Sequence, residues 1–318
     1  MRSQASLGAV YAAVGILFTA IAFVALVSLV SVKTRADITL TTTSTAATNA
    51  SPTAENLIVS DKRGLGDISK TGFTPNEGGY KTLFVRGKVF DPNGCVDIRR
   101  VEIKVYRSGV GNLCQENFNN CYGTSTESLI ACGKSSYASF EAGLDIKYYV
   151  EPTDAGSQYE NQYWFAEATA IDSGLKRYTS VTNFEVNSLA AIEASTSTFS
   201  FGTVDLGAVS NEAMISLSNV GNRDVLGAVR ADSDLKSNLP GFSQVSSSQV
   251  HISFTKGFAW GAGAPILTTS EVALPMTLAK QLVDYSIVSL PIYLRIMMPE
   301  RGISGTYSNN LIFTAKAF

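Results

Sequence analysis

Most of the chain alternates apolar and polar side chains with a period of two, which is typical of half-buried β-strands. Residues 81–91, 99–107 and 163–172 have this pattern most clearly, and turns rich in Gly, Asn, Asp and Ser separate such segments. Their expected inward positions are Leu83, Val85 and Val89; Val101, Ile103 and Val105; and Trp164, Ala166, Ala168 and Ala170. No stretch after residue 36 sustains a 3.6-residue period. The pattern therefore predicts an all-β ectodomain built from β-sandwiches, with Trp164 in a core.

The first 36 residues have a different pattern. Leu7–Val32 is a run of 26 uncharged, mostly apolar residues, with Arg2 before it and Lys33 and Arg35 after it. A membrane-spanning helix needs about 20 residues, whereas the apolar part of a cleaved signal peptide has roughly 7–15. No small-x-small cleavage site follows the run. Residues 1–36 are therefore predicted to form an uncleaved transmembrane helix, which contacts membrane lipid through residues 7–32.

A segment rich in Thr, Ser and Ala follows, from residue 37 to residue 57. This composition buries too little apolar surface to offset the entropy of ordering, so we interpret the segment as a flexible stalk. Asn49-Ala50-Ser51 fits the acceptor pattern for N-glycosylation, although a bare linker is the simpler interpretation. The remaining residues are enough for two domains of ordinary size, which we place at 58–188 and 189–318.

Four cysteines indicate the compartment: Cys95, Cys114, Cys121 and Cys132. The gaps between them, of 18, 6 and 10 residues, do not match the paired spacing of a zinc site. An even number of cysteines clustered in one domain after an export segment favours two disulfides, which persist in an oxidising compartment. Three pairings are open, of which we favour Cys114–Cys121 with Cys95–Cys132 around it. Because the charges flanking the apolar run are balanced, the cysteines set the orientation. The amino terminus is expected in the cytoplasm and the bulk of the chain outside it.

Two parts of the chain resemble known families. Residues 85–109, together with an A-x-D-x-G turn, are similar to bacterial Ig-like or fibronectin-type-III-like modules, and residues 199–222 resemble the opening of ASH-type Ig-like domains of surface proteins. The residues that carry these resemblances are Ala170, Asp172 and Gly174 in the first, and Phe201, Gly202, Leu206, Gly207, Asn219, Gly221 and Asn222 in the second. The resemblance implies two tandem Ig-like β-sandwiches of a bacterial or archaeal cell-surface protein. It implies little about activity.

These features together predict a membrane-anchored cell-surface protein with a structural or binding role, in adhesion or envelope architecture. Its partner would be an unidentified protein or glycan. The alternative is a filament subunit similar to type IV pilins, whose N-terminal helix packs in a filament core. Arg2 and Gly8 fit a pilin leader loosely, but the helix that follows contains no Glu. In that alternative the chain assembles with copies of itself.

The sequence offers few residues for catalysis. Its one histidine, His251, alternates with Val250 and Ile252, which predicts that the imidazole lies on the solvent face of a strand. With one histidine and no expected free cysteine, the chain lacks residues needed for Ser-His-Asp, Cys-His or multi-histidine metal mechanisms. The remaining possibility is catalysis by two carboxylates that meet in space. A net charge of −2 without a Lys/Arg cluster argues against nucleic-acid binding. We expect no enzyme, no nucleic-acid partner and no organic cofactor.

One segment has oxygen ligands suited to calcium. Residues 91–94, Asp-Pro-Asn-Gly, precede Asp97, and either Asp154 or Asp172 would add a further carboxylate. A β-turn with Pro second and Gly fourth explains the same segment, and the spacing differs from that of an EF-hand. We therefore interpret it first as a turn. The calcium candidates are Asp91, Asn93, Asp97 and Asp172.

Phe258 and Trp260 lie among glycines in residues 256–265. Aromatic side chains on a loop at the end of a sandwich can contact a glycan, a protein partner or lipid. The simpler interpretation is that both rings fold back over the core. Both interpretations predict a loop at this position.

Overall fold

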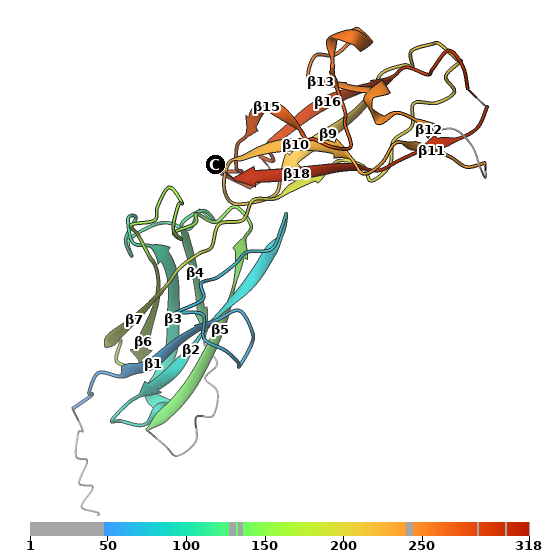
Figure 1. The fold of residues 1–318 in the computed structure, drawn as a ribbon. Coiled ribbons are helices and arrows are strands. Elements are labelled where there is room, and N and C mark those ends of the chain that lie inside the picture. The colour runs from blue at the N-terminus through green and yellow to red at the C-terminus, as the bar shows by residue number, and fades with distance from the viewer. Residues whose placement is uncertain are drawn as a thin grey trace, which may run out of the picture. The chain divides into compact units, whose positions relative to one another are not determined.

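The computed structural model describes residues 48–126, 132, 136–239, 244–284, 286–302 and 304–317. Within these residues the regular structure consists of β-strands and three short 3₁₀ turns, and every pair of named strands is antiparallel (Figure 1). The all-β prediction is confirmed. The described part contains no helix long and apolar enough to cross a membrane. The predicted transmembrane helix, residues 7–32, lies outside the described residues, as does the predicted stalk before residue 48.

The first group of strands forms two sheets. Their orders are β1-β2-β5 and β4-β3-β6-β7. The elements are β1 (Thr53–Ser60), β2 (Tyr80–Phe90), the 3₁₀ turn η1 (Cys95–Asp97), β3 (Ile98–Arg107), β4 (Cys121–Thr126), β5 (Tyr137–Lys147), β6 (Trp164–Asp172) and β7 (Arg177–Phe184). Side chains from both sheets form one hydrophobic core, so these residues make a β-sandwich.

The alternating positions predicted from the sequence line this core. The ten predicted inward side chains of β2, β3 and β6 are all buried. Trp164 is fully buried, and its indole Nε1 donates to the backbone oxygen of Glu151 at 2.9 Å. Because a buried indole N–H needs a partner, this hydrogen bond lets the largest core side chain pack without an unsatisfied donor.

Strand β1 begins inside the predicted stalk. Thr53 pairs with Phe90 of β2, so residues 53–57 belong to the first sheet and that part of the stalk prediction is wrong. The pairing shifts between Glu55 and Ile58, and Asn56 between them has φ 54°. Such a bulge interrupts the period of two by which a strand is recognised in a sequence. The small and polar residues of this strand hid it further.

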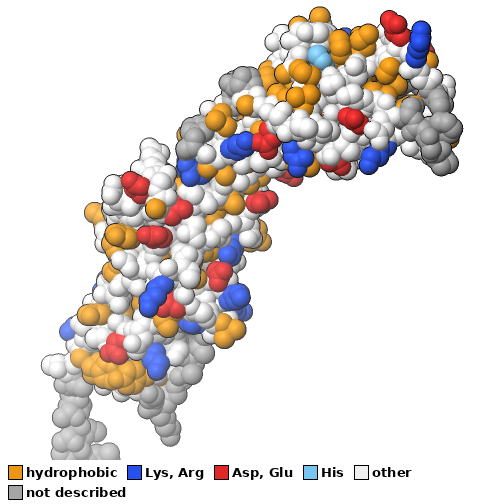
Figure 2. Space-filling model, in the orientation of Figure 1, with side chains coloured by type: hydrophobic (Ala, Val, Ile, Leu, Met, Phe, Trp, Pro, Cys, Tyr) orange, Lys and Arg blue, Asp and Glu red, His pale blue; other side chains and the backbone are white. Residues whose placement is uncertain are grey.

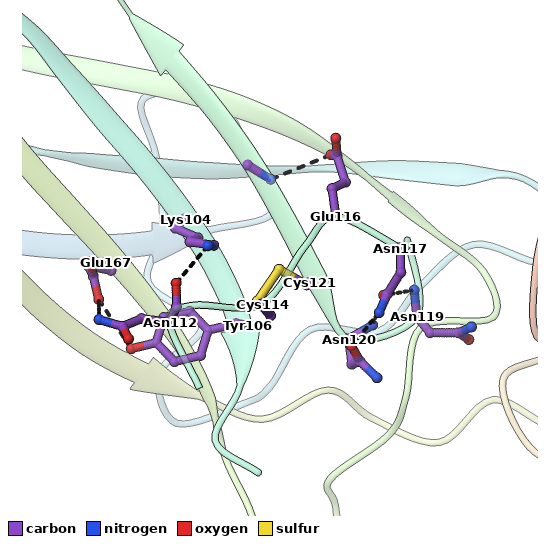
Figure 3. Close-up of a disulfide and its surroundings, with 11 residues drawn as sticks. Lys104, Tyr106, Asn112, Cys114, Glu116, Asn117, Asn119, Asn120, Cys121 and Glu167 are labelled. Carbon is purple, nitrogen blue, oxygen red and sulfur yellow. Dashed lines mark hydrogen bonds between the residues drawn. A yellow bond between two sulfur atoms is a disulfide. The ribbon is translucent and has the colours of Figure 1, made fainter. Parts of the chain in front are cut away.

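Both disulfides have the favoured pairing. Cys95 is joined to Cys132, and Cys114 to Cys121. Figure 3 shows the second bridge closing the loop before β4. The chain just before this bridge is also fixed, because Lys104 Nζ donates to the backbone oxygen of Asn112 at 2.6 Å (Figure 3).

The second group of strands forms three sheets around a separate core. Their orders are β14-β13-β16-β9-β8, β15-β10-β18 and β12-β11-β17. The strands are β8 (Ile192–Ala194), β9 (Ala213–Asn219), β10 (Val225–Ala231), β11 (Leu235–Ser237), β12 (Gln244–Val245), β13 (Val250–Ser253), β14 (Ala264–Pro265), β15 (Val272–Leu278), β16 (Ser289–Ile296), β17 (Tyr307–Ser308) and β18 (Leu311–Ala317). The 3₁₀ turns η2 (Ser247–Gln249) and η3 (Trp260–Ala262) flank β13.

Candidate cation site

Three carboxylates converge at one end of the first sandwich. Asp91 follows the last residue of β2, Asp97 ends η1, and Asp172 ends β6. One carboxylate oxygen from each lies within 4.8 Å of the others. The sequence therefore identified three residues that meet in space, although β2 and β6 belong to different sheets.

The predicted β-turn is present and builds one side of this acidic cluster, which consists of Asp91, Asp97 and Asp172. Gly94 N donates to the backbone oxygen of Asp91 at 3.0 Å, and Asn93 N donates to Asp91 Oδ1 at 2.7 Å. Gly94 has φ 105°, which only glycine adopts readily, and Asp97 N then donates to its oxygen at 3.0 Å. The turn and the acidic cluster are thus two consequences of the same residues, not competing interpretations.

The turn between β6 and β7 builds the other side. Asp172 Oδ1 accepts from Lys176 N at 2.7 Å, and the backbone oxygen of Asp172 accepts from Leu175 N at 3.1 Å. Ser173 joins the two sides, because its N–H donates to the backbone oxygen of Asp97 at 2.8 Å and its hydroxyl donates to Asp97 Oδ1. These bonds hold the carboxylates of two sheets close together despite their repulsion.

The chain before β1 closes the acidic cluster. Asn49 Nδ2 donates to Asp172 Oδ2 at 3.0 Å, and Ala50 N donates to Asn93 Oδ1 at 2.9 Å. Lys176 Nζ donates to the backbone oxygen of Asn49 at 2.6 Å. Asn93 therefore holds this segment beside the site through its side-chain oxygen.

Asn49 was not a candidate ligand in the sequence, where its one signal was the glycosylation pattern. The glycine of the A-x-D-x-G turn accounts for its position. A Cβ atom on Gly174 would lie 2.1 Å from Asn49 Nδ2, so any larger residue would displace the amide. The atom that a glycan would modify is the same Nδ2 that donates to Asp172.

Two oxygens at this site are buried without a hydrogen-bond partner. Asp91 is 0% exposed, and its Oδ2 has none in the described structure. Asn49 Oδ1 is also buried and has no hydrogen-bond partner in the described structure. Leaving a buried polar atom unsatisfied costs about 1–3 kcal/mol, and more for a charged group. The acidic cluster thus has acceptors without donors, which is the arrangement that a cation completes.

The electrostatic environment of Asp91 also favours a bound cation. Burial raises the pKa of Asp91, the N–H of Asn93 opposes this, and the charges of Asp97 and Asp172 raise the pKa again. Two like charges about 4 Å apart near a protein surface repel by about 4 kcal/mol. Lys176 offsets part of this charge, but its ammonium bonds to Asn49. The arrangement is suited to a hard cation with oxygen ligands.

Asp154 does not join the acidic cluster. Its carboxylate accepts from Ser188 N at 2.8 Å and from Ser188 Oγ at 2.6 Å, so it organises the chain after β7. The suggestion that Asp154 would be the additional carboxylate is wrong, and Asp172 has that position.

The aromatic residues of the 256–265 loop fold back, as the simpler interpretation held. Phe258 is 6% exposed. Trp260 Nε1 donates to the backbone oxygen of Gln249 at 2.8 Å. The indole stacks on His251 with ring centroids 4.2 Å apart, which leaves His251 only 9% exposed. The prediction that His251 faces solvent is therefore wrong, because the loop covers the outer face of β13.

The class that the fold and the site define is an all-β protein of antiparallel sheets, with two disulfides and an acidic cluster in its first sandwich. No protein-family model matches the chain, and no curated protein matches its sequence. Among solved structures, the C-terminal domain of the Streptococcus agalactiae AgI/II polypeptide BspA is 11% identical with a TM-score of 0.25, and the match covers 83% of this chain and 95% of that one.

The C-terminal domain of the Streptococcus pyogenes antigen I/II-family protein AspA gives 10% identity and a TM-score of 0.25, over 85% of this chain and 100% of that one. The secreted serine protease VesC from Vibrio cholerae gives 12% and 0.18, over 74% and 48%. These scores are too low to assign a function.

Proposed function

We propose that the chain is a single-pass, membrane-anchored cell-surface protein with a structural or binding role. Residues 7–32 cross the membrane, with the amino terminus in the cytoplasm. Residues 58–188, extended at the start by β1, and residues 189–318 are two tandem Ig-like β-sandwiches outside the cytoplasm. The role is adhesion or envelope architecture, with a protein or glycan as partner.

The observation that carries this proposal is the pair of disulfides in the first sandwich. Cys95 and Cys121 are buried in or beside its core, and they are bonded to Cys132 and Cys114 respectively. Disulfides of this structural kind form and persist in oxidising compartments. A long apolar run that precedes a disulfide-bonded sandwich in the chain fits export with retention at the membrane.

The surface charge supports a role outside the class of nucleic-acid binders. On the face shown in Figure 2, basic and acidic side chains are interspersed. Several charged side chains of the described residues form ion pairs, such as Arg63 with Glu141 and Arg177 with Glu102, each at 3.1 Å. Because the face shown has no basic stripe among its described residues, its attraction to phosphate backbones is weak. A partner would be recognised by shape and hydrogen bonds.

A non-catalytic role fits the surroundings of His251 and of the acidic cluster, the two places where catalytic residues were considered. His251 is covered by the Trp260 indole. The Asp91 carboxylate of the acidic cluster is fully buried, whereas the paired carboxyls of glycosidases flank an open sugar site. Both arrangements favour structure over turnover.

The filament-subunit alternative depends on residues 7–32, which lie outside the described part, and no observation within that part favours it. Mass spectrometry of the mature amino terminus separates the two functions. Membranes from the source cells are extracted with detergent, sheared surface material is collected separately, and the terminal peptide of the chain is sequenced in each. We expect an intact Met1 or Arg2 in the detergent extract. A terminus near Ala9 in sheared filaments would contradict the anchor and establish the alternative.

A further inference from the structure

We propose that Asp91, Asp97, Asp172 and Asn49 form a calcium site that fastens the segment before β1 to the first sandwich. The inference rests on the geometry of the acidic cluster and holds whether or not residues 7–32 span a membrane. It assigns the site two functions, which are binding the cation and fixing the direction in which the chain enters the sandwich.

The spacing of the oxygens matches one calcium ion. Calcium binds oxygens at about 2.3–2.6 Å, so two ligands on opposite sides of the ion are about 4.6–5.2 Å apart. One oxygen from each of Asp91, Asp97 and Asp172 lies within 4.8 Å of the other two. This spacing is compatible with contact of all three oxygens with a single ion.

The oxygens also have free capacity. Asp91 Oδ2 is buried without a partner and can bind the ion directly. Asp97 Oδ1 and both oxygens of Asp172 each accept one hydrogen bond, and a carboxylate oxygen retains a second lone pair. Asn49 now points Nδ2 at Asp172, and a half-turn of its amide would present the unpartnered Oδ1 instead. Water would supply the remaining ligands of a calcium ion.

The type of ligand favours calcium over the common alternatives. The donors are oxygens alone, because Cys95 beside them is locked in a disulfide, and zinc and copper prefer nitrogen or sulfur. Magnesium requires a near-ideal octahedron at 2.0–2.1 Å and keeps several waters, so it is a poorer match for carboxylates held this far apart by two sheets. Lys176 is the nearby basic group, and its Nζ bonds to the backbone oxygen of Asn49, where it limits the affinity.

Cation binding would act on the chain that enters the first sheet. Asn49 contacts Asp172, and Ala50 contacts Asn93 of the adjoining turn, so two consecutive residues are held by the site. Strand β1 starts at Thr53. A bound ion that replaces the Asn49–Asp172 hydrogen bond with two metal–oxygen bonds would hold this entrance more firmly.

The test uses the full chain in detergent, with disulfides intact and residual metal removed by a chelator. Isothermal titration with CaCl₂ is expected to give a dissociation constant of about 0.1–1 mM, the range of extracellular calcium modules, and MgCl₂ is expected to bind at least tenfold more weakly. At 10 mM calcium the melting temperature of the sandwich should rise by about 3–10 °C. No heat and no change in melting temperature with calcium would overturn the proposal.

Variants locate the ion. Asp97→Asn and Asp172→Asn should each weaken calcium binding at least tenfold. Glu77→Gln removes one exposed charge from the chain before β2, at the far end of that strand from Asp91, and should bind as the unmodified chain does. Because a variant in the acidic cluster could fold poorly, its melting temperature without calcium is measured first. Calcium affinity unchanged in both folded variants would place the ion elsewhere and overturn the assignment.

Hydrogen exchange tests the fastening of the segment. Exchange at the amide of Ala50, which donates to Asn93, should slow at least threefold on calcium addition in the unmodified chain. In Asn49→Ala the slowing should be lost while some calcium affinity remains. Calcium binding without slower exchange at Ala50 would overturn the proposed effect on the segment and leave a site that is confined to the sandwich.

Discussion

At the scale of single residues, a buried ion pair has a central place in the first sandwich. Arg107 Nε donates to Glu151 Oε2 at 2.6 Å, and the two side chains are 9% and 10% exposed. The guanidinium also lies 3.8 Å from the centre of the Tyr159 ring and donates to Gln162 Oε1. Removing one member of such a pair leaves the other charge buried and uncompensated, which is far more costly than losing an exposed pair.

Glu151→Ala is therefore expected to lower the free energy of unfolding by about 3–5 kcal/mol, measured by denaturant unfolding of the full chain with its disulfides intact. Glu55→Ala, at an exposed position of β1, is the matched control and should change the free energy by no more than about 0.5 kcal/mol. Equal effects of the two substitutions would mean that the Arg107–Glu151 pair does not stabilise the fold.

The candidate site was only partly predictable from single residues. Asp91 begins a turn motif that the sequence displays and Asp97 follows it, and Asp172 lies in a recognisable turn between two strands. Asn49 could not be found in this way, because it is 123 positions from its partner Asp172 and lies in a segment of small polar residues. The burial of His251 was missed for a similar reason. Alternation along β13 gives the direction of its side chain but not the presence of Trp260 above it.

At the scale of elements, the two disulfides close loops of very different length. Cys114 and Cys121 are 7 residues apart, and Cys95 and Cys132 are 37 apart. A cross-link stabilises mainly by restricting the unfolded chain, and the effect grows with the length of the loop. The longer bridge starts from η1, the element that also holds Asp97.

Replacing both cysteines of the short bridge by serine is expected to cost about 2.4 kcal/mol, and the same change in the long bridge about 3.8 kcal/mol. Chemical denaturation of the two double variants measures the difference. A larger loss from the Cys114–Cys121 bridge would show that native-state contacts of its loop, and not chain entropy, dominate its contribution.

Strands with a clear period of two, such as β2, β3 and β6, could be predicted from the sequence with their buried faces. Strand β1 was misassigned because its bulge at Asn56 breaks the period. Strands of two or three residues, such as β12 and β17, are too short for alternation to be recognised, and their pairing depends on contacts with distant parts of the chain.

At the scale of the whole molecule, the described residues contain two large hydrophobic cores and a small buried cluster of Tyr148, Tyr149, Ala191 and Val220. One core ends at Val186, and the other begins after it with partly buried residues from Ala190. The disulfides and the acidic cluster belong to the first sandwich, and the covered histidine belongs to the second. The acidic cluster and its adjoining turn hold Asn49 and Ala50, in the chain that leads back to the proposed anchor.

The central claim is that both sandwiches lie outside the cytoplasm, and labelling of lysines on intact cells tests it most directly. Source cells are treated with a membrane-impermeant amine reagent before or after lysis, and modified lysines are located by mass spectrometry, with a cytoplasmic protein as control. Lys70 and Lys256 are exposed, one in each half of the described chain. We predict that both are labelled on intact cells, to the same extent as after lysis. Labelling of these lysines only after lysis would contradict the account.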